Sequence, residues 1–177
     1  DKIGLILFTD RIEKSIPPRK GRTAAMRLVR EVLAAEETRR ETDIAAAFRF
    51  LNNVQKRHAV VFLISDFMDS NYEKELRILS RKHDIICCPV SDPREMELVD
   101  AGLIEIQDPE TGDLFLLDTG SSRLRNEFRR SAEQDQRNLN EMFRKLKVDT
   151  ISLSTARPFI DDVRKLFRQR QIRAGRG

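Results

Sequence analysis

Tryptophan is absent from this sequence of 177 residues, and tyrosine occurs only once. Aromatic residues make up 6% of the chain, and they are mostly phenylalanines that recur at helical spacing on apolar faces. This pattern predicts that the phenylalanines are core residues. Because little aromatic surface remains for stacking bases, the composition argues against a protein that binds single-stranded nucleic acid.

Only two cysteines occur, and they are neighbours in sequence, Cys87 and Cys88. Neighbouring side chains of a strand point to opposite faces, so no disulfide is expected between them. Without a cysteine framework, a reducing compartment such as the cytoplasm is the expected location. The apolar run 85–90 predicts buried structural thiols, and reactive thiol chemistry is the alternative.

Long apolar runs are also missing, since nothing approaches the 18 or more residues of a membrane span, and no signal peptide is visible. A hydrophobic content of 40% and a charged content of 35% are typical of a globular protein with a solvated exterior. The length fits one domain over residues 1–177. The chain starts at Asp1 in what looks like the middle of a fold, so we expect an N-terminally truncated domain.

The net charge is only +4, from 33 basic and 29 acidic residues, and part of the excess lies in the tail 168–177. A solvated terminus is the expected role of this tail. Contact of the tail with nucleic acid is the weaker alternative.

The stretch 58–69 organises the rest of the chain. Residues 59–64 form an unbroken apolar run, too short for a helix and rich in β-branched side chains, which predicts a strand buried on both faces of a parallel sheet. The run ends in Ser65 and Asp66. Because ligands of open α/β sheets bind at the carboxyl ends of strands, Asp66 is a candidate metal or substrate ligand. The alternative is that Asp66 caps a turn or the following helix.

On the N-terminal side, residues 2–9 predict a second buried strand. A short charged strand at 12–16 follows and stops at Pro17 and Pro18, which suits an antiparallel hairpin at a sheet edge. Helices are predicted at 21–35 and 43–55, with Thr42 at the N-cap position of the second. A helix at 72–81 and a strand at 84–90 follow the central strand, an order that predicts right-handed parallel crossovers.

On the C-terminal side, a loop at 91–98 precedes two strand-like runs at 102–107 and 113–118, separated by turn-forming residues. This pattern predicts a β-hairpin at 102–118 inserted into an α/β sheet. A long helix at 121–146, a short strand at 148–153 and a final helix opened by Pro158 complete the chain. The apolar residues expected to face inward from the final helix are Phe159, Ile160, Val163, Leu166 and Phe167. The predicted fold is therefore a doubly wound, mostly parallel α/β sheet with an antiparallel edge strand and an inserted hairpin.

Three other groups of residues suggest chemistry. Asp66 and Asp69 resemble the two-carboxylate site of a metal-dependent phosphoester hydrolase, although no general base, nucleophile or glycine-rich loop accompanies them. Asp92 and Glu95 form either a carboxylate pair or, as we favour, a turn with a helix-start glutamate. His83 lacks the further histidine and aspartate ligands that a metal phosphohydrolase needs.

Several segments together resemble the bacterial domain-of-unknown-function-fifty-eight family, a branch of the von Willebrand factor A-like proteins. They keep the family's order and spacing along nearly the whole chain. The segments are Asp1-Lys-Ile-Gly-Leu-Ile-Leu-Phe-Thr9, Arg40-Glu-Thr-Asp-Ile44, Ile64-Ser-Asp-Phe-Met-Asp69, Arg81-Lys-His-Asp-Ile-Ile86, Asp92-Pro-Arg-Glu95 and Asp108-Pro-Glu-Thr-Gly-Asp113.

The resemblance implies a doubly wound sheet with a metal-ion-dependent adhesion site at the carboxyl ends of its strands. In the wider fold three loops build this site, and Thr42 and Asp66 match the second and third. The first strand and its Asp-x-Ser-x-Ser loop have no match here, so we expect them upstream of Asp1. Mg²⁺ takes six oxygen ligands, so the resemblance implies Mg²⁺ binding in the full-length parent and weak or no binding in this chain.

The function implied by the resemblance is a non-enzymatic adaptor that binds a protein partner, a MoxR-type AAA+ ATPase. The missing strand would leave two sheet edges unpaired, and a homodimer across this gap would cover them. The alternatives are the hydrolase with Asp66 and Asp69, and a nucleic-acid binder that uses the basic tail.

Overall fold

A computed structural model of the chain describes residues 1–35, 41–107 and 113–174. The chain forms two compact units: Asp1–His58 with Met68–Leu79, and Ala59–Phe67 with Ser80–Gly177. The polar link at 36–40, most of the hairpin turn at 108–113 and the end of the basic tail lie outside the described residues. The expectation of one domain over the whole chain stays a prediction.

The first unit is built on an antiparallel pair, β1 (Lys2–Phe8) and β2 (Ile12–Lys20), which contacts α1 (Arg22–Leu33) and α2 (Ile44–Val54). The prediction that the second strand stops at Pro17 was wrong, because β2 continues to Lys20. The register places Pro17 and Pro18 opposite Gly4 in a β-bulge, where ladder hydrogen bonds are interrupted and proline loses no partner. A Cβ at Gly4 would lie 2.8 Å from the carbonyl oxygen of Ile16, so only glycine fits there.

The second unit contains the parallel sheet that the helix–strand alternation predicts, which confirms the α/β class. Its strands are β3 (Val60–Ser65), β4 (Asp84–Ser91), β7 (Asp149–Thr150) and β8 (Leu153–Ser154). The strands β3, β7 and β8 each pair with β4 in parallel. The single last strand expected at 148–153 is therefore two short ones. Between β3 and β4 the chain passes through α3 (Glu73–Ser80), most of which belongs to the first unit.

The core of the second unit lies on β4, whose residues are buried on both faces. Ile86 and Cys88 pack with Ile151 and with Leu166 of α5 (Ile160–Ala174). The prediction that β3 is buried on both faces was wrong, since Leu63 is buried but Phe62 is 46% exposed. Within the described part of this unit β3 is an edge strand, because β4 alone pairs with it.

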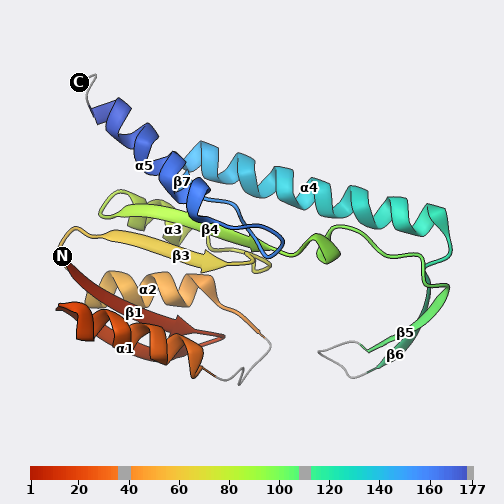
Figure 1. Cartoon of the computed structure of the whole chain (residues 1–177), viewed down its shortest axis with the longest axis horizontal. Coiled ribbons are helices and arrows are strands. Elements are labelled where there is room, and N and C mark those ends of the chain that lie inside the picture. Colours follow the sequence, from red (N-terminus) through yellow and green to blue (C-terminus); the bar gives the residue numbers. More distant parts are fainter. Residues whose placement is uncertain (36–40, 108–112, 175–177) are drawn as a thin grey trace. The chain divides into compact units, whose positions relative to one another are not determined.

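A long arm extends from this core (Figure 1). After the short 3-10 helix η1 (Pro93–Glu95), β5 (Leu103–Gln107) pairs antiparallel with β6 (Leu114–Asp118), which confirms the antiparallel pair expected at 102–118. The helix α4 (Ser122–Leu146) then leads back to β7, and its N-cap is Ser121, as predicted for a helix over 121–146.

Phenylalanines are less buried than their spacing predicts. Phe143 is 1% exposed, but Phe128 on the same helix is 37% exposed. In α5, Leu166 is buried, whereas Ile160 and Phe167 are exposed, as is Phe159 directly before the helix, so the expected inward face is only partly correct. The periodicity predicts an apolar stripe along a helix. Only the part of the stripe that packs against a neighbouring element is buried.

Candidate functional site

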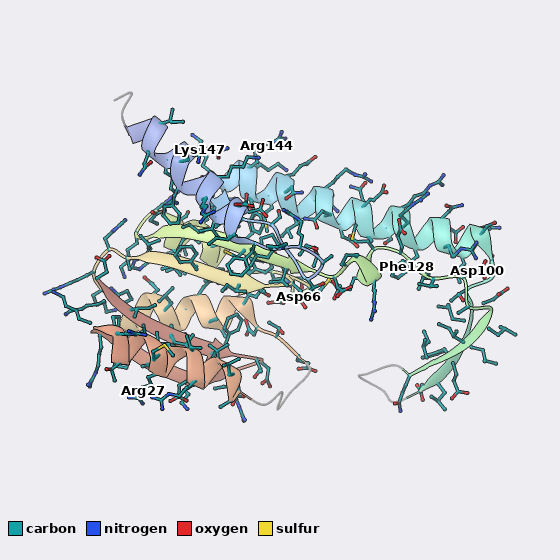
Figure 2. The ribbon with its side chains drawn as sticks, viewed as in Figure 1. Arg27, Asp66, Asp100, Phe128, Arg144 and Lys147 are labelled. Atoms are coloured by element: carbon teal, nitrogen blue, oxygen red, sulfur yellow. The ribbon has the colours of Figure 1, made fainter. Side chains whose placement is uncertain are left out.

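Asp66 directly follows the last residue of β3 and is exposed (Figure 2). The hydroxyl of Ser65 donates to Asp66 Oδ1 at 3.4 Å and accepts from the backbone N–H of Phe67 at 3.1 Å. Phe67 has a positive φ of 61° and its ring packs edge-on against Phe143, with the ring centroids 5.1 Å apart. The buried Phe67 therefore anchors the loop, and the carboxylate before it stays at the surface.

Thr42 is exposed and lies two residues before the start of α2 in the first unit. The prediction that Thr42 caps this helix was wrong. The cap is Asp43, whose Oδ1 accepts a hydrogen bond from the backbone N–H of Ala46 at 2.6 Å. The backbone N–H of Asp43 donates to the carbonyl of Thr9 at 2.9 Å, which ties the helix start to the end of β1.

Asp69 belongs to the same helix start, although 25 residues separate it from Ile44. Its Oδ2 accepts from the backbone N–H of Ile44 at 2.7 Å, and its Oδ1 accepts from the backbone N–H of Ser70 at 2.5 Å. A carboxylate at a helix N-terminus is stabilised by the unpaired amides and by the helix dipole. Each carboxylate oxygen of Asp69 thus accepts a backbone hydrogen bond. This structural role does not favour a catalytic pair of Asp66 and Asp69 in a hydrolase.

The two site residues predicted from the sequence, Thr42 and Asp66, belong to different units. Their convergence on one cation therefore stays a prediction. Among residues 1–35, 41–107 and 113–174, no group of three or more histidine, cysteine, aspartate or glutamate side chains is arranged to hold a metal ion. Thr42 and Asp66 alone would provide two of the six oxygens that Mg²⁺ takes.

Asp92 and Glu95 form the helix-start arrangement that the sequence favours. Asp92 Oδ1 accepts from the N–H of Arg94 at 2.8 Å, and the Glu95 carboxylate accepts from the N–H of Asp92 at 3.0 Å, which is a capping box. The Thr155 hydroxyl donates to Asp92 Oδ2 at 2.7 Å. This hydrogen bond, followed by that from Arg94, lowers the pKa of Asp92.

The thiols of Cys87 and Cys88 are free and buried, which confirms the expected structural cysteines. Burial raises the pKa of Cys87 to about 12 and that of Cys88 to about 11. Both thiols are therefore protonated at neutral pH, which disfavours nucleophilic chemistry because the thiolate is the nucleophile.

Sequence reasoning missed Asp43 and Asp69 as paired carboxylates at the start of α2. The signal for Asp43 was available, since an aspartate directly before an apolar helical run is a strong N-cap residue. No local pattern links Asp69 to Ile44, because their contact joins two separate loops.

Residues 1–138 match the family model described as "Protein of unknown function DUF58". The chain belongs to the DUF58 family. Its relatives include an uncharacterized protein of Mycobacterium tuberculosis, 26% identical over 176 residues, which are 97% of this chain and 55% of that protein. An equally similar protein occurs in Mycobacterium bovis. This DUF58 chain spans about half the length of these two relatives.

A third DUF58 relative, an uncharacterized protein of Mycobacterium avium, is 27% identical over 161 residues, which are 88% of this chain and 94% of that protein. Among solved structures, an aerotolerance-related membrane protein of Bacteroides fragilis is 14% identical over 82% of this chain and 80% of that chain, with a TM-score of 0.45. The protein BatB of Bacteroides thetaiotaomicron is 14% identical over 83% of this chain and 80% of that chain, with a TM-score of 0.43. Within the described ranges, no helix of this chain is both long enough and apolar enough to cross a membrane.

Proposed function

We propose that this DUF58 chain is a non-enzymatic adaptor module that binds a partner protein with the loops at the carboxyl ends of its strands. The observation that carries the proposal is the placement of Asp66, which is exposed immediately beyond the parallel strand β3 on a loop held by the buried Phe67. A fixed loop with an outward carboxylate suits recognition, because little conformational freedom is lost on binding. Loops at this edge are the usual ligand sites of open α/β sheets.

The arrangement that we propose is von Willebrand factor A-like, with Asp66 and Thr42 as part of a metal-ion-dependent adhesion site. Further oxygens would come from an Asp-x-Ser-x-Ser loop upstream in the full-length parent and from an acidic group of the partner. The metal would be Mg²⁺, which prefers oxygen ligands and retains several waters. The chain itself would contribute one hydroxyl and one carboxylate to this site.

The partner that we propose is a MoxR-type AAA+ ATPase, in the cytoplasm. A pull-down of the full-length parent with the cognate ATPase, with Mg²⁺ and with a chelator, tests this. We expect Mg²⁺-dependent recovery that Asp66→Ala and Thr42→Ala both reduce. Asp135→Ala, which removes an exposed carboxylate of α4, is the matched control and should leave recovery unchanged. Equal recovery of unrelated ATPases would contradict the proposal.

The hydrolase that would use Asp66 and Asp69 is a different function, and the hydrogen bonds of Asp69 do not favour it. If the chain hydrolysed phosphoesters with Mg²⁺ or Mn²⁺ and Asp66→Ala abolished this activity, the hydrolase function would be favoured over the adaptor proposal. Binding to nucleic acid through the tail 168–177 would weaken steeply with salt.

A further inference from the structure

The β5–β6 hairpin exposes more apolar surface than an isolated hairpin tolerates. Leu103, Leu114 and Leu116 are 70%, 62% and 73% exposed. The register places Leu103 opposite Asp118, Glu105 opposite Leu116 and Gln107 opposite Leu114, so all six side chains share one face. We call these six residues the hairpin face. Exposed apolar patches mark interaction sites, and a two-stranded hairpin alone is only marginally stable in water.

The hairpin segment is also strongly acidic. From Glu95 to Ser122 the sequence contains eight acidic residues and no lysine or arginine, although the whole chain has a net charge of +4. Two of the carboxylates, Glu105 and Asp118, lie on the hairpin face itself, on diagonal positions roughly 7–8 Å apart. A partner surface that fits this face must therefore be both apolar and basic.

The hairpin is held firmly at its base. The buried Thr119 hydroxyl donates to the carbonyl of Gly102 at 2.7 Å and accepts from the N–H of Ala101 at 3.0 Å. Arg125, in the first turn of α4, donates to the carbonyl of Thr119 at 2.5 Å and forms an ion pair with Asp100 at 3.1 Å. The hairpin face is thus presented at the start of α4, next to the labelled Asp100 (Figure 2).

The same chain carries a surface with the complementary chemistry on α5. The helix α5 has five arginines and lysines against two acidic residues, Asp161 and Asp162, in its first turn. Asp161 forms an exposed ion pair with Arg164 at 3.5 Å, and residues 163–174 contain no acidic side chain. Ile160 and Phe167, which are 46% and 43% exposed, lie two turns apart on the outer side, and the exposed Arg164 and Arg168 lie one turn apart beside them. We call these four residues the α5 face.

Within one chain, the hairpin face and the α5 face cannot contact each other. The hairpin is fixed to the first turn of α4, whereas α4 ends beside β7, where Arg170 of α5 binds Asp149 at 2.7 Å. The 25 residues of α4 hold these two places roughly 37 Å apart. The two faces can therefore meet only between two copies of the chain.

We propose that the hairpin face docks on the α5 face of a second copy of this chain. Leu103, Leu114 and Leu116 cover Ile160 and Phe167, and the Glu105 and Asp118 carboxylates pair with the Arg164 and Arg168 guanidiniums. The contact is head-to-tail, because it uses different surfaces of the two copies. It is independent of the proposed adaptor function, since it involves neither Thr42 nor Asp66.

Sedimentation over a range of protein concentrations tests the proposal. We expect the average mass to rise with concentration and the association to weaken at high salt, because exposed charge pairs are screened. Leu116→Lys on the hairpin face and Arg168→Glu on the α5 face should each weaken association at least about tenfold, because each places like charges opposite one another. Glu127→Lys on α4, an exposed charge outside both faces, is the control and should not change it.

Mixing distinguishes this contact from every other way of self-associating. A Leu116→Lys copy keeps its α5 face and an Arg168→Glu copy keeps its hairpin face, so each variant alone associates weakly while the mixture forms a complex. The double variant Glu105→Arg with Arg168→Glu should recover part of the association by exchanging the charges. A monomeric wild-type chain at every concentration, or a mixture that does not associate, would overturn the proposal. Circular dichroism of each variant verifies that the fold is retained.

Discussion

Arg170 in α5 binds both carboxylate oxygens of Asp84 at 2.7 Å, although 86 residues separate the two in sequence. The same guanidinium binds Asp149 at 2.7 Å. Asp84 begins β4 and Asp149 begins β7, so one side chain joins the final helix to two parallel strands. The hydrogen bond with Asp84 is the main cause that raises the pKa of Arg170, so the group stays charged at any ordinary pH.

Replacing Arg170 should destabilise the second unit, because two carboxylates would lose their shared cation. We expect Arg170→Ala to lower the free energy of unfolding by about 2 kcal/mol, less than for a fully buried pair since Arg170 is 21% exposed. The loss for Arg170→Lys should be smaller than for Arg170→Ala, because lysine keeps the charge but cannot form the bidentate hydrogen bonds. Urea denaturation measures both. Arg130→Ala, an exposed arginine of α4, is the control, and equal losses would contradict the argument.

Asp69 is expected to stabilise the start of α2 from a distant loop. Asp69→Ala removes the acceptor for the amides of Ile44 and Ser70, and we expect a loss of about 1–2 kcal/mol in unfolding free energy. Hydrogen exchange of the Ile44 amide should accelerate at the same time. Unchanged exchange in the variant would show that another group holds the helix start.

Asp43 and Thr42 provide a matched pair for the cap of α2. Asp43→Ala should cost about 1 kcal/mol, because the amide of Ala46 loses its acceptor. Thr42→Ala should change stability by no more than about 0.5 kcal/mol, as for exposed side chains in general. Thermal unfolding of the two variants measures the difference in stability. A larger loss for Thr42→Ala than for Asp43→Ala would show that Thr42 is the cap.

Asp92 should titrate below the ordinary range of aspartates. The hydrogen bond from Thr155 is the first cause that lowers its pKa, so Thr155→Val should raise the pKa towards the usual value. A lowered folded-state pKa means that the contribution to stability is present above the unfolded pKa, about 3.9, and is lost as pH falls through the folded pKa. Carboxyl NMR titration measures the shift, with Thr23→Val as the control.

Cys87 and Cys88 should resist thiol reagents while the protein is folded. Their pKa values of about 12 and about 11 lie well above that of an ordinary thiol, so the thiolate fraction falls at least about a hundredfold. An aromatic disulfide reagent at pH 8 should label neither thiol in native protein and both in denaturant. Rapid labelling of the native protein would show that β4 opens readily.

Much of the site's local structure could be predicted from the sequence, but its partners could not. The short apolar run before Asp66 predicted correctly that this carboxylate lies at the end of a parallel strand. The cap of α2 was assigned one residue too early, because threonine and aspartate are both good caps and only the backbone geometry decides between them. The role of Asp69 depends on a contact between two loops, and hydrophobic periodicity carries no information about such contacts.

The sequence by itself determined the elements, because apolar periodicity, turn residues and caps act within a few neighbours. The alternation of helices and strands around β3 and β4, the antiparallel pair β5–β6 and the N-cap of α4 at Ser121 all follow from such local signals. Tertiary structure alone decided which apolar faces are covered. Phe62, Phe167 and Leu116 have the same sequence signature as core residues, yet they are exposed because burial depends on what packs against a face.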